Sequence, residues 1–136
     1  MVDPDITVVT SGEITDLLPR GWADDPDILP IDCPLDVSSI SRTVESLGDC
    51  YYLILLPATE LGMRMCEVIR RLHCKAPIIL VGESKDRETL LYSAQLGCMD
   101  FITAEDDLGT VKKKLILYLK LYSMSQKIQQ AEMRIK

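Results

Sequence analysis

The chain has 136 residues, of which 47% are hydrophobic and 26% charged, and its formal net charge is −6. This length and balance fit one soluble globular domain. The acidic charge disfavours direct binding to DNA or RNA, because Lys and Arg side chains supply most of that affinity. The longest apolar run, residues 51–56, is too short to cross a bilayer, and the N-terminus does not read as a signal peptide. We therefore expect a cytoplasmic protein that does not bind membranes.

The cysteines do not form a metal-binding or redox motif in the sequence. No two of them are spaced C-x-x-C, and the chain has a single histidine. We interpret them as reduced and mostly buried side chains, and we expect no metal and no cofactor. The five are Cys33, Cys50, Cys66, Cys74 and Cys98.

The N-terminal part alternates short apolar segments with turns. Residues 6–9 are β-branched and predict a first strand, and residues 13–18 predict a brief helix. Residues 28–31 predict an edge strand, since the proline among them lacks a ladder donor. Residues 36–47 have apolar positions at helical spacing, with Asp36 as the expected cap.

The middle of the chain gives stronger patterns. Residues 51–56 are continuously apolar, which is typical of a central strand covered on both faces. Residues 60–74 predict an amphipathic helix and residues 77–81 a second buried strand. The inward stripe that we predict for that helix is Leu61, Met65, Val68, Ile69 and Leu72.

The remaining elements continue the alternation. Residues 86–96 predict a helix, with Leu90, Leu91 and Ala94 facing inward, and residues 100–103 predict a last short strand. From residue 108 to residue 136 the chain reads as one long helix. Alternating strands and helices favour a flavodoxin-like, doubly wound five-stranded parallel sheet with an extended C-terminal helix. We divide the chain into an α/β domain, 1–120, and a helical extension, 121–136.

The final helix has two apolar stripes. Val111, Leu115 and Leu119 are placed to pack on the sheet. A second stripe, spaced by alternating steps of four and three as in a coiled coil, consists of Leu117, Leu121, Met124, Ile128, Ala131 and Ile135. An isolated helix of this length is marginal in water, so we expect it to form a homodimer with the same helix of a second copy. The alternative is that the tail folds back on its own domain or frays.

Residues 94–102 read AQLGCMDFI, which resembles the A-x-x-x-G-A-x-D-[YF]-[IL] segment of the receiver domains of bacterial response regulators. Residues 53–56 and the helix after them resemble the third strand and helix of that family, and residues 77–80 its fourth strand. The resemblance runs from about residue 6 to residue 120. It implies a receiver fold and a place in two-component signal transduction.

The resemblance also implies a phosphorylation site, and this sequence departs from it. In receivers, carboxylates hold Mg²⁺, an aspartate takes the phosphoryl group, and a hydroxyl and a lysine bind the phosphate. The positions that match these functional groups are Thr10, Ser11, Pro57, Gly82 and Ala104. None of them carries the group that the family uses there. Only the aromatic switch position is kept, as Phe101, which we expect to be a switch or interface residue. We therefore predict no catalytic residue and no enzymatic activity.

Two alternatives rest on acidic residues. Glu13, Glu60, Glu83 and Glu105 lie near expected strand ends, where carboxylates suit a metal or small-ligand sensor. A displaced acid such as Glu60 or Asp49 would instead make a non-standard phosphoacceptor. We interpret these acids as solvated loop and helix N-terminal charges.

The leading hypothesis is a pseudo-receiver signalling module that acts through protein contact and dimerisation. The last helix ends without a cap, so we expect a following output domain or a signalling partner to receive the signal. By resemblance, that domain is a diguanylate cyclase, a sensor kinase or a transcription activator.

Overall fold

The computed structural model describes residues 6–83, 88, 91 and 94–135, without the side chains of residues 13, 134 and 135. Its strands form one parallel sheet in the order β2-β1-β3-β4-β5, the order of flavodoxin-like domains. The strands are β1 (Ile6–Thr10), β2 (Ile28–Asp32), β3 (Leu53–Pro57), β4 (Ile78–Val81) and β5 (Cys98–Ile102). The predicted fold class is confirmed.

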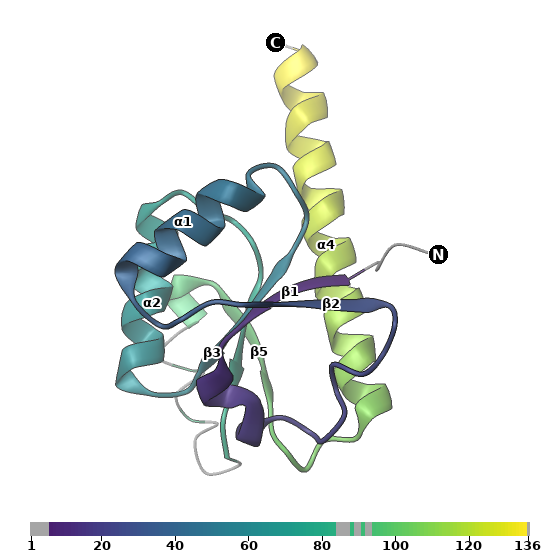
Figure 1. Ribbon diagram of the computed structural model, residues 1–136. Coiled ribbons are helices and arrows are strands. Elements are labelled where there is room, and N and C mark those ends of the chain that lie inside the picture. Colours follow the sequence, from purple (N-terminus) through teal and green to yellow (C-terminus); the bar gives the residue numbers. More distant parts are fainter. Residues whose placement is uncertain (1–5, 84–87, 89–90, 92–93, 136) are drawn as a thin grey trace.

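Helices cover both faces of the sheet. α1 (Val37–Leu47) and α2 (Glu60–Arg71) lie on one face, and α4 (Leu108–Ile135) lies along the other (Figure 1). Two short 3₁₀ segments complete the described elements, η1 (Gly12–Leu17) and η3 (Ala94–Leu96). η1 stands where the sequence predicted a brief helix.

The central strand β3 shows why its sequence is continuously apolar. Leu53 and Leu55 pack into the layer that includes α4, whereas Ile54 and Leu56 pack into the layer under α1 and α2. All four side chains are buried. A strand covered on both faces has no position for a polar side chain, so the predicted buried central strand is confirmed.

The structure differs from the prediction in two of the predicted helices, and the first is the one predicted over residues 86–96. Leu91 is 80% exposed and Ala94 is also exposed, so the inward face predicted for residues 86–96 is wrong at both positions. Leu90 lies outside the described residues. The described end of this segment is the 3₁₀ turn η3, whose tighter winding moves side chains away from α-helical spacing.

The buried stripe of α2 is also rotated from the predicted one. Leu61 is 40% and Leu72 42% exposed, whereas Gly62 and Cys66 are buried. Helix periodicity does not distinguish a glycine that packs closely from one that faces solvent. The predicted stripe followed side-chain size and is wrong at its two ends.

Arg70, in the last turn of α2, joins three segments through backbone carbonyls. Its Nε donates to the Leu96 carbonyl oxygen at 2.7 Å, Nη1 donates to those of Cys74 at 2.8 Å and Ala76 at 3.0 Å, and Nη2 donates to that of Gly97 at 3.3 Å. These bonds hold α2 against the chain entering β4 and β5. Because the guanidinium is a rigid fork, one side chain serves all four acceptors.

We expect Arg70→Lys to lower the free energy of unfolding by about 2 kcal/mol, because an ammonium group reaches fewer of the four carbonyls and leaves others unpaired. Urea denaturation followed by circular dichroism measures this change. Arg64→Lys on the same helix is the matched control. Arg64 is exposed, and it makes a 3.4 Å contact with the exposed Glu60 that contributes little to stability. That variant should change stability by less than about 0.5 kcal/mol, and equal losses in both variants would contradict the role of Arg70.

The start of α4 is capped by its own N-terminal residues and is held to the loop before β2. The Asp107 carboxylate accepts a hydrogen bond from the Thr110 backbone N–H at 2.8 Å and caps the helix. Lys112 Nζ lies 2.8 Å from Asp25 and 2.9 Å from Asp27, in the loop before β2. The hydrogen bond from Lys112 contributes most to lowering the pKa of Asp25. These contacts set the direction in which the long helix leaves the domain.

Candidate functional site

The residues predicted to replace the receiver chemistry lie at one edge of the sheet. Because all strands are parallel, their C-terminal ends meet there. Thr10 ends β1 and Ser11 follows it, Pro57 ends β3, Gly82 follows β4, and Ala104 comes after β5. The structure therefore brings the sequence positions together as the resemblance implies.

Pro57, which the resemblance assigns to the position of the acceptor aspartate, is buried beneath the first turn of α2. A Cβ on Gly62 would overlap the Pro57 carbonyl oxygen and would lie 3.2 Å from Pro57 Cγ. The Thr59 hydroxyl caps this helix by accepting from the Gly62 N–H at 3.2 Å. The first turn of α2 and the end of β3 are thus in direct contact, and Pro57 at this contact has no nucleophilic atom.

A hollow of about 390 Å³ opens at this edge between the ends of β4 and β5. Its acidic lining residues are Asp16, Glu83 and Glu105, and no lysine or arginine is among the described residues that line it. A phosphoryl group carries nearly two negative charges at neutral pH, so this lining repels it. Among the described residues that line the hollow, none carries the positive charge that stabilises a transferring phosphoryl group.

The acidic residues considered for a metal or a displaced phosphoacceptor do not form one cluster. Glu83 and Glu105 line the hollow, whereas Glu60 lies 3.4 Å from Arg64 on the surface of α2. Asp49 precedes β3 and so lies at the opposite edge of the sheet. The side chain of Glu13 is outside the described residues. Within the described part of the chain, no three His, Cys, Asp or Glu side chains are placed to hold a metal ion.

Phe101 is fixed in the core and its strand is fixed to α4. The ring is 3% exposed, within the layer beneath α1 and α2. The Phe101 carbonyl oxygen accepts from Lys114 Nζ at 2.8 Å, and the Tyr118 hydroxyl donates to the Asp100 carboxylate at 2.9 Å. Burial, followed by this hydrogen bond, raises the pKa of Tyr118 to about 12. No local pattern in the sequence indicates these contacts, which join residues 13 and 18 positions apart.

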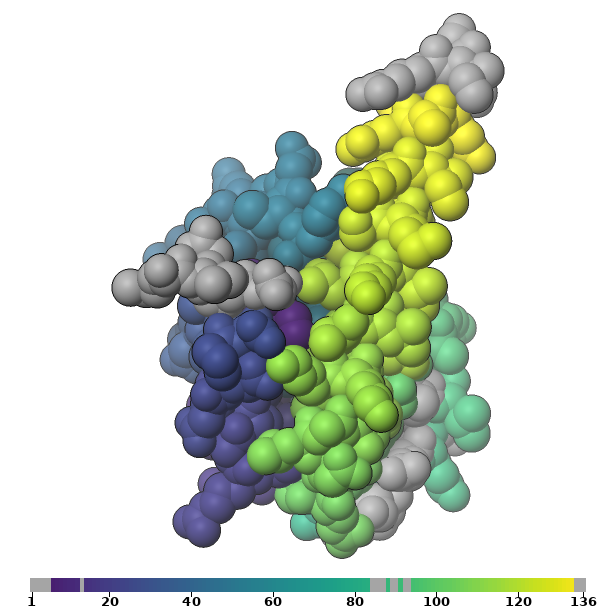
Figure 2. Space-filling view, turned by 90° about the vertical axis from the view of Figure 1, so that its right-hand side faces the viewer, coloured from purple at the N-terminus to yellow at the C-terminus, as the bar shows by residue number. Residues whose placement is uncertain are grey.

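The second stripe of α4 faces solvent. Leu117, Leu121, Met124 and Ile128 are between 46% and 59% exposed, whereas Leu115 is fully buried. Met124 stands nine residues from Leu115, which is about 180° of helix rotation. Ala131 is exposed too, and the side chain of Ile135 is outside the described residues. Figure 2 shows the end of α4 projecting beyond the body of the domain.

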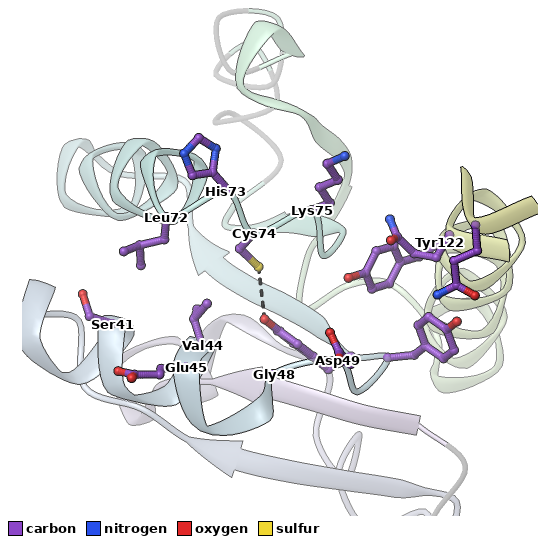
Figure 3. A pocket seen from close by; sticks show the side chains of 14 residues that line it. Ser41, Val44, Glu45, Gly48, Asp49, Leu72, His73, Cys74, Lys75 and Tyr122 are labelled. Atoms are coloured by element: carbon purple, nitrogen blue, oxygen red, sulfur yellow. Dashed lines mark hydrogen bonds between the residues drawn. The ribbon is translucent and has the colours of Figure 1, made fainter. Parts of the chain in front are cut away.

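A second hollow, which the sequence did not predict, lies at the opposite edge of the sheet, where α4 leaves the domain. It has a volume of about 700 Å³ and lies between the C-terminal ends of α1 and α2 and the middle of α4 (Figure 3). Tyr122 of α4 packs edge-on against Tyr51, with ring centroids 5.5 Å apart. The helix thus stays in contact with the domain past residue 120 and continues unbroken through the predicted domain division.

The sheet order and the helix layers define a flavodoxin-like α/β domain. Solved structures of receiver domains are similar to it over nearly the whole chain. NtrX from Brucella abortus aligns with a TM-score of 0.75 and 16% identity, over 94% of this chain and 29% of NtrX. The signal receiver domain of a putative LuxO repressor protein from Vibrio parahaemolyticus gives 0.65 and 14%, over 92% of this chain and 97% of that domain.

The N-terminal domain of the nisin resistance regulator NsrR has a TM-score of 0.58 and 20% identity, over 87% of this chain and 99% of that domain. At these identities the similarity shows the fold, which is that of response-regulator receiver domains. The chain spans less than a third of the length of NtrX. No protein-family model and no curated protein matches the sequence. None of the described helices has the length and apolarity of a membrane span.

Proposed function

We propose that this chain is a non-enzymatic pseudo-receiver that regulates a following or partner output domain through dimerisation of α4. The observation that carries this proposal is the exposed stripe of Leu117, Leu121, Met124 and Ile128 on the side of α4 away from its own domain. Apolar side chains at coiled-coil spacing lose contact with water when a second helix covers them. Burying the exposed part of each side chain contributes roughly 1 kcal/mol.

The strand-end edge supports a module that works without phosphorylation. Pro57 has no nucleophile, and Gly82 and Ala104 lack the hydroxyl and the lysine that would bind a phosphate. The acidic lining of the adjacent hollow disfavours an anionic ligand there as well. We therefore favour the pseudo-receiver over a phosphoacceptor that uses Glu60 or Asp49, and over an anion sensor at this edge.

Incubation with acetyl phosphate and Mg²⁺, followed by intact-mass measurement, tests the missing chemistry. We expect the mass to stay unchanged. An added phosphoryl group of about 80 Da on any aspartate or glutamate would contradict the proposal. A receiver domain that keeps its acceptor aspartate, treated in parallel, shows that the reagent is active.

Sedimentation equilibrium tests the pairing. We expect the full chain to be a dimer at tens of micromolar and a chain ending at Ser123 to be a monomer, because truncation removes most of the exposed stripe and keeps the contact of Tyr122 with the domain. Circular dichroism of both chains checks that the α/β domain is folded. A monomeric full chain would overturn dimerisation and would favour a tail that acts on a partner alone.

The length of NtrX supports an output domain. NtrX is more than three times as long as the region that this chain matches, so its receiver-like part is one segment of a larger regulator. α4 projects from the edge of the sheet opposite the C-terminal ends of the strands (Figure 1). In the proposed mechanism, two paired α4 helices change their register or rotate, and this movement is transmitted to the output domain that follows them or binds them.

A further inference from the structure

Two buried thiols face each other between α2 and β5. Cys66 Sγ and Cys98 Sγ are 3.1 Å apart, within hydrogen-bond distance for a thiol pair. Cys66 is 0% and Cys98 7% exposed. Since the sulfurs of a disulfide are about 2.05 Å apart, the two atoms need to approach by roughly 1 Å to form one.

The surrounding structure keeps the two sulfurs next to each other. Arg70 lies one helical turn after Cys66 and donates to the carbonyl oxygens of Leu96 and Gly97, directly before Cys98. Gly97 has a φ of +83°, and a Cβ there would be 2.9 Å from Arg70 Nη2. A glycine in the left-handed region therefore allows this segment to approach the helix. The thiol pair is part of a rigid junction in which its neighbours fix both partners.

We propose that Cys66 and Cys98 form a modification site at which a hydroperoxide produces a reversible intramolecular disulfide. In the first step the Cys98 thiolate attacks the peroxide oxygen, giving a sulfenic acid and releasing an alcohol, or water when the oxidant is hydrogen peroxide. In the second step the Cys66 sulfur attacks the sulfenic sulfur and displaces its oxygen as water, so that the S–S bond forms. Both thiol hydrogens leave in these products, the two sulfurs lose two electrons, and the O–O bond of the peroxide is reduced.

The surroundings of the two sulfurs assign their order of reaction. Cys98 retains the little solvent access that the pair has, so it meets the oxidant first. The hydrogen bond with Cys98, and then burial, raise the pKa of the Cys66 thiol. A thiol kept protonated is a poor first nucleophile, and Cys66 acts second because its sulfur lies 3.1 Å from the sulfur of Cys98, where the sulfenic acid forms. Because only Cys98 has any solvent access, the reaction is slow and bulky oxidants are excluded.

The bond would join α2 covalently to β5, the strand whose Asp100 and Phe101 contact α4. Oxidation would therefore stiffen the side of the domain that holds the long helix. This inference goes beyond the proposed function and does not depend on it, because the disulfide forms within one chain. It requires neither a dimer nor an output domain.

The test is oxidation of the folded full chain with a few equivalents of hydrogen peroxide, followed by alkylation and tryptic peptide mapping. Cleavage after lysine and arginine places each of the five cysteines in a different peptide. We expect an intact mass lower by about 2 Da, a linked pair of peptides 65–70 and 88–112, and complete reversal by dithiothreitol. Near-ultraviolet circular dichroism shows that the protein stays folded.

Two variants make the result specific. Cys98→Ala should abolish the link, whereas Cys50→Ser, which removes an exposed thiol, should leave it unchanged. Recovery of both peptides alkylated, while Cys50 alone is oxidised, would overturn the proposal. A link that forms only in urea would overturn it as well, since the proposal rests on the folded geometry. Neither outcome would affect the sedimentation result on which dimerisation depends.

Discussion

Gly62→Ala is expected to lower the free energy of unfolding by about 3 kcal/mol, an effect of overpacking at the contact between α2 and β3. The added methyl group would overlap the Pro57 carbonyl oxygen and would lie 2.9 Å from its carbonyl carbon. These are backbone atoms of a central strand, so they do not move aside as a flexible side chain does. Relief requires α2 to shift away from the sheet. Urea denaturation of the variant and the parent chain measures the loss.

Gly12→Ala is the matched control for this substitution. Gly12 lies at the same edge of the sheet, and a Cβ there would have no heavy atom within 4 Å. The hydrogen bond from its N–H to Asp32 Oδ1, 3.1 Å long, does not involve a side chain at Gly12. We expect a change of less than about 0.5 kcal/mol. If the two variants were equally stable, the direct contact of α2 with the end of β3 would be refuted. Our explanation of why α2 packs directly on Pro57 would be refuted with it.

This contact links the stability of the domain to its proposed lack of phosphorylation chemistry. Pro57 is buried, and its ring and carbonyl group lie against the glycine of α2. An aspartate at residue 57 would bring a charge into this contact, and the described residues that line the neighbouring hollow include no basic side chain to pair with it. The absence of a nucleophilic atom at residue 57 and the close packing of α2 on it are therefore two aspects of the same arrangement.

The sheet was predictable because its signal is local. Residues 51–56 and 77–81 are continuously apolar, and the structure buries β3 and β4 between helices on both faces. The prolines and the β-branched residues near the N-terminus placed β1 and β2 for similar reasons. The α4 stripe follows from periodicity alone, and the structure leaves its described members exposed. Whether a second copy covers them stays a prediction.

The features that escaped prediction depend on contacts between distant segments. Cys66 and Cys98 meet across 32 positions, and the hollow beside Tyr122 is made from α1, α4 and the segments that precede β3 and β4. No spacing rule within one segment contains that information. The predicted inward positions Leu61 and Leu91 were wrong for a related reason, since the neighbour that decides burial is not encoded in the helix itself.

Ile128→Glu is expected to raise the dissociation constant of the dimer at least about a hundredfold, which corresponds to about 2.8 kcal/mol. Ile128 is 58% exposed in the single chain and lies on the α4 stripe. In a parallel pair the two glutamates would face each other at the position where the seam excludes water, so desolvation and like-charge repulsion both oppose association. Sedimentation equilibrium over a range of concentrations measures the constant.

Gln129→Glu separates this effect from that of charge alone. It adds the same negative charge one residue along α4, on the side that faces the domain, where Gln129 Oε1 lies 3.4 Å from Lys75 Nζ. A carboxylate there keeps the contact and adds an ion pair of small value, so the dissociation constant should change by less than about twofold. Similar weakening by both variants would indicate repulsion between whole acidic chains, and no weakening by Ile128→Glu would place the contact outside the stripe. Only the unequal pair of results supports pairing through this face of α4.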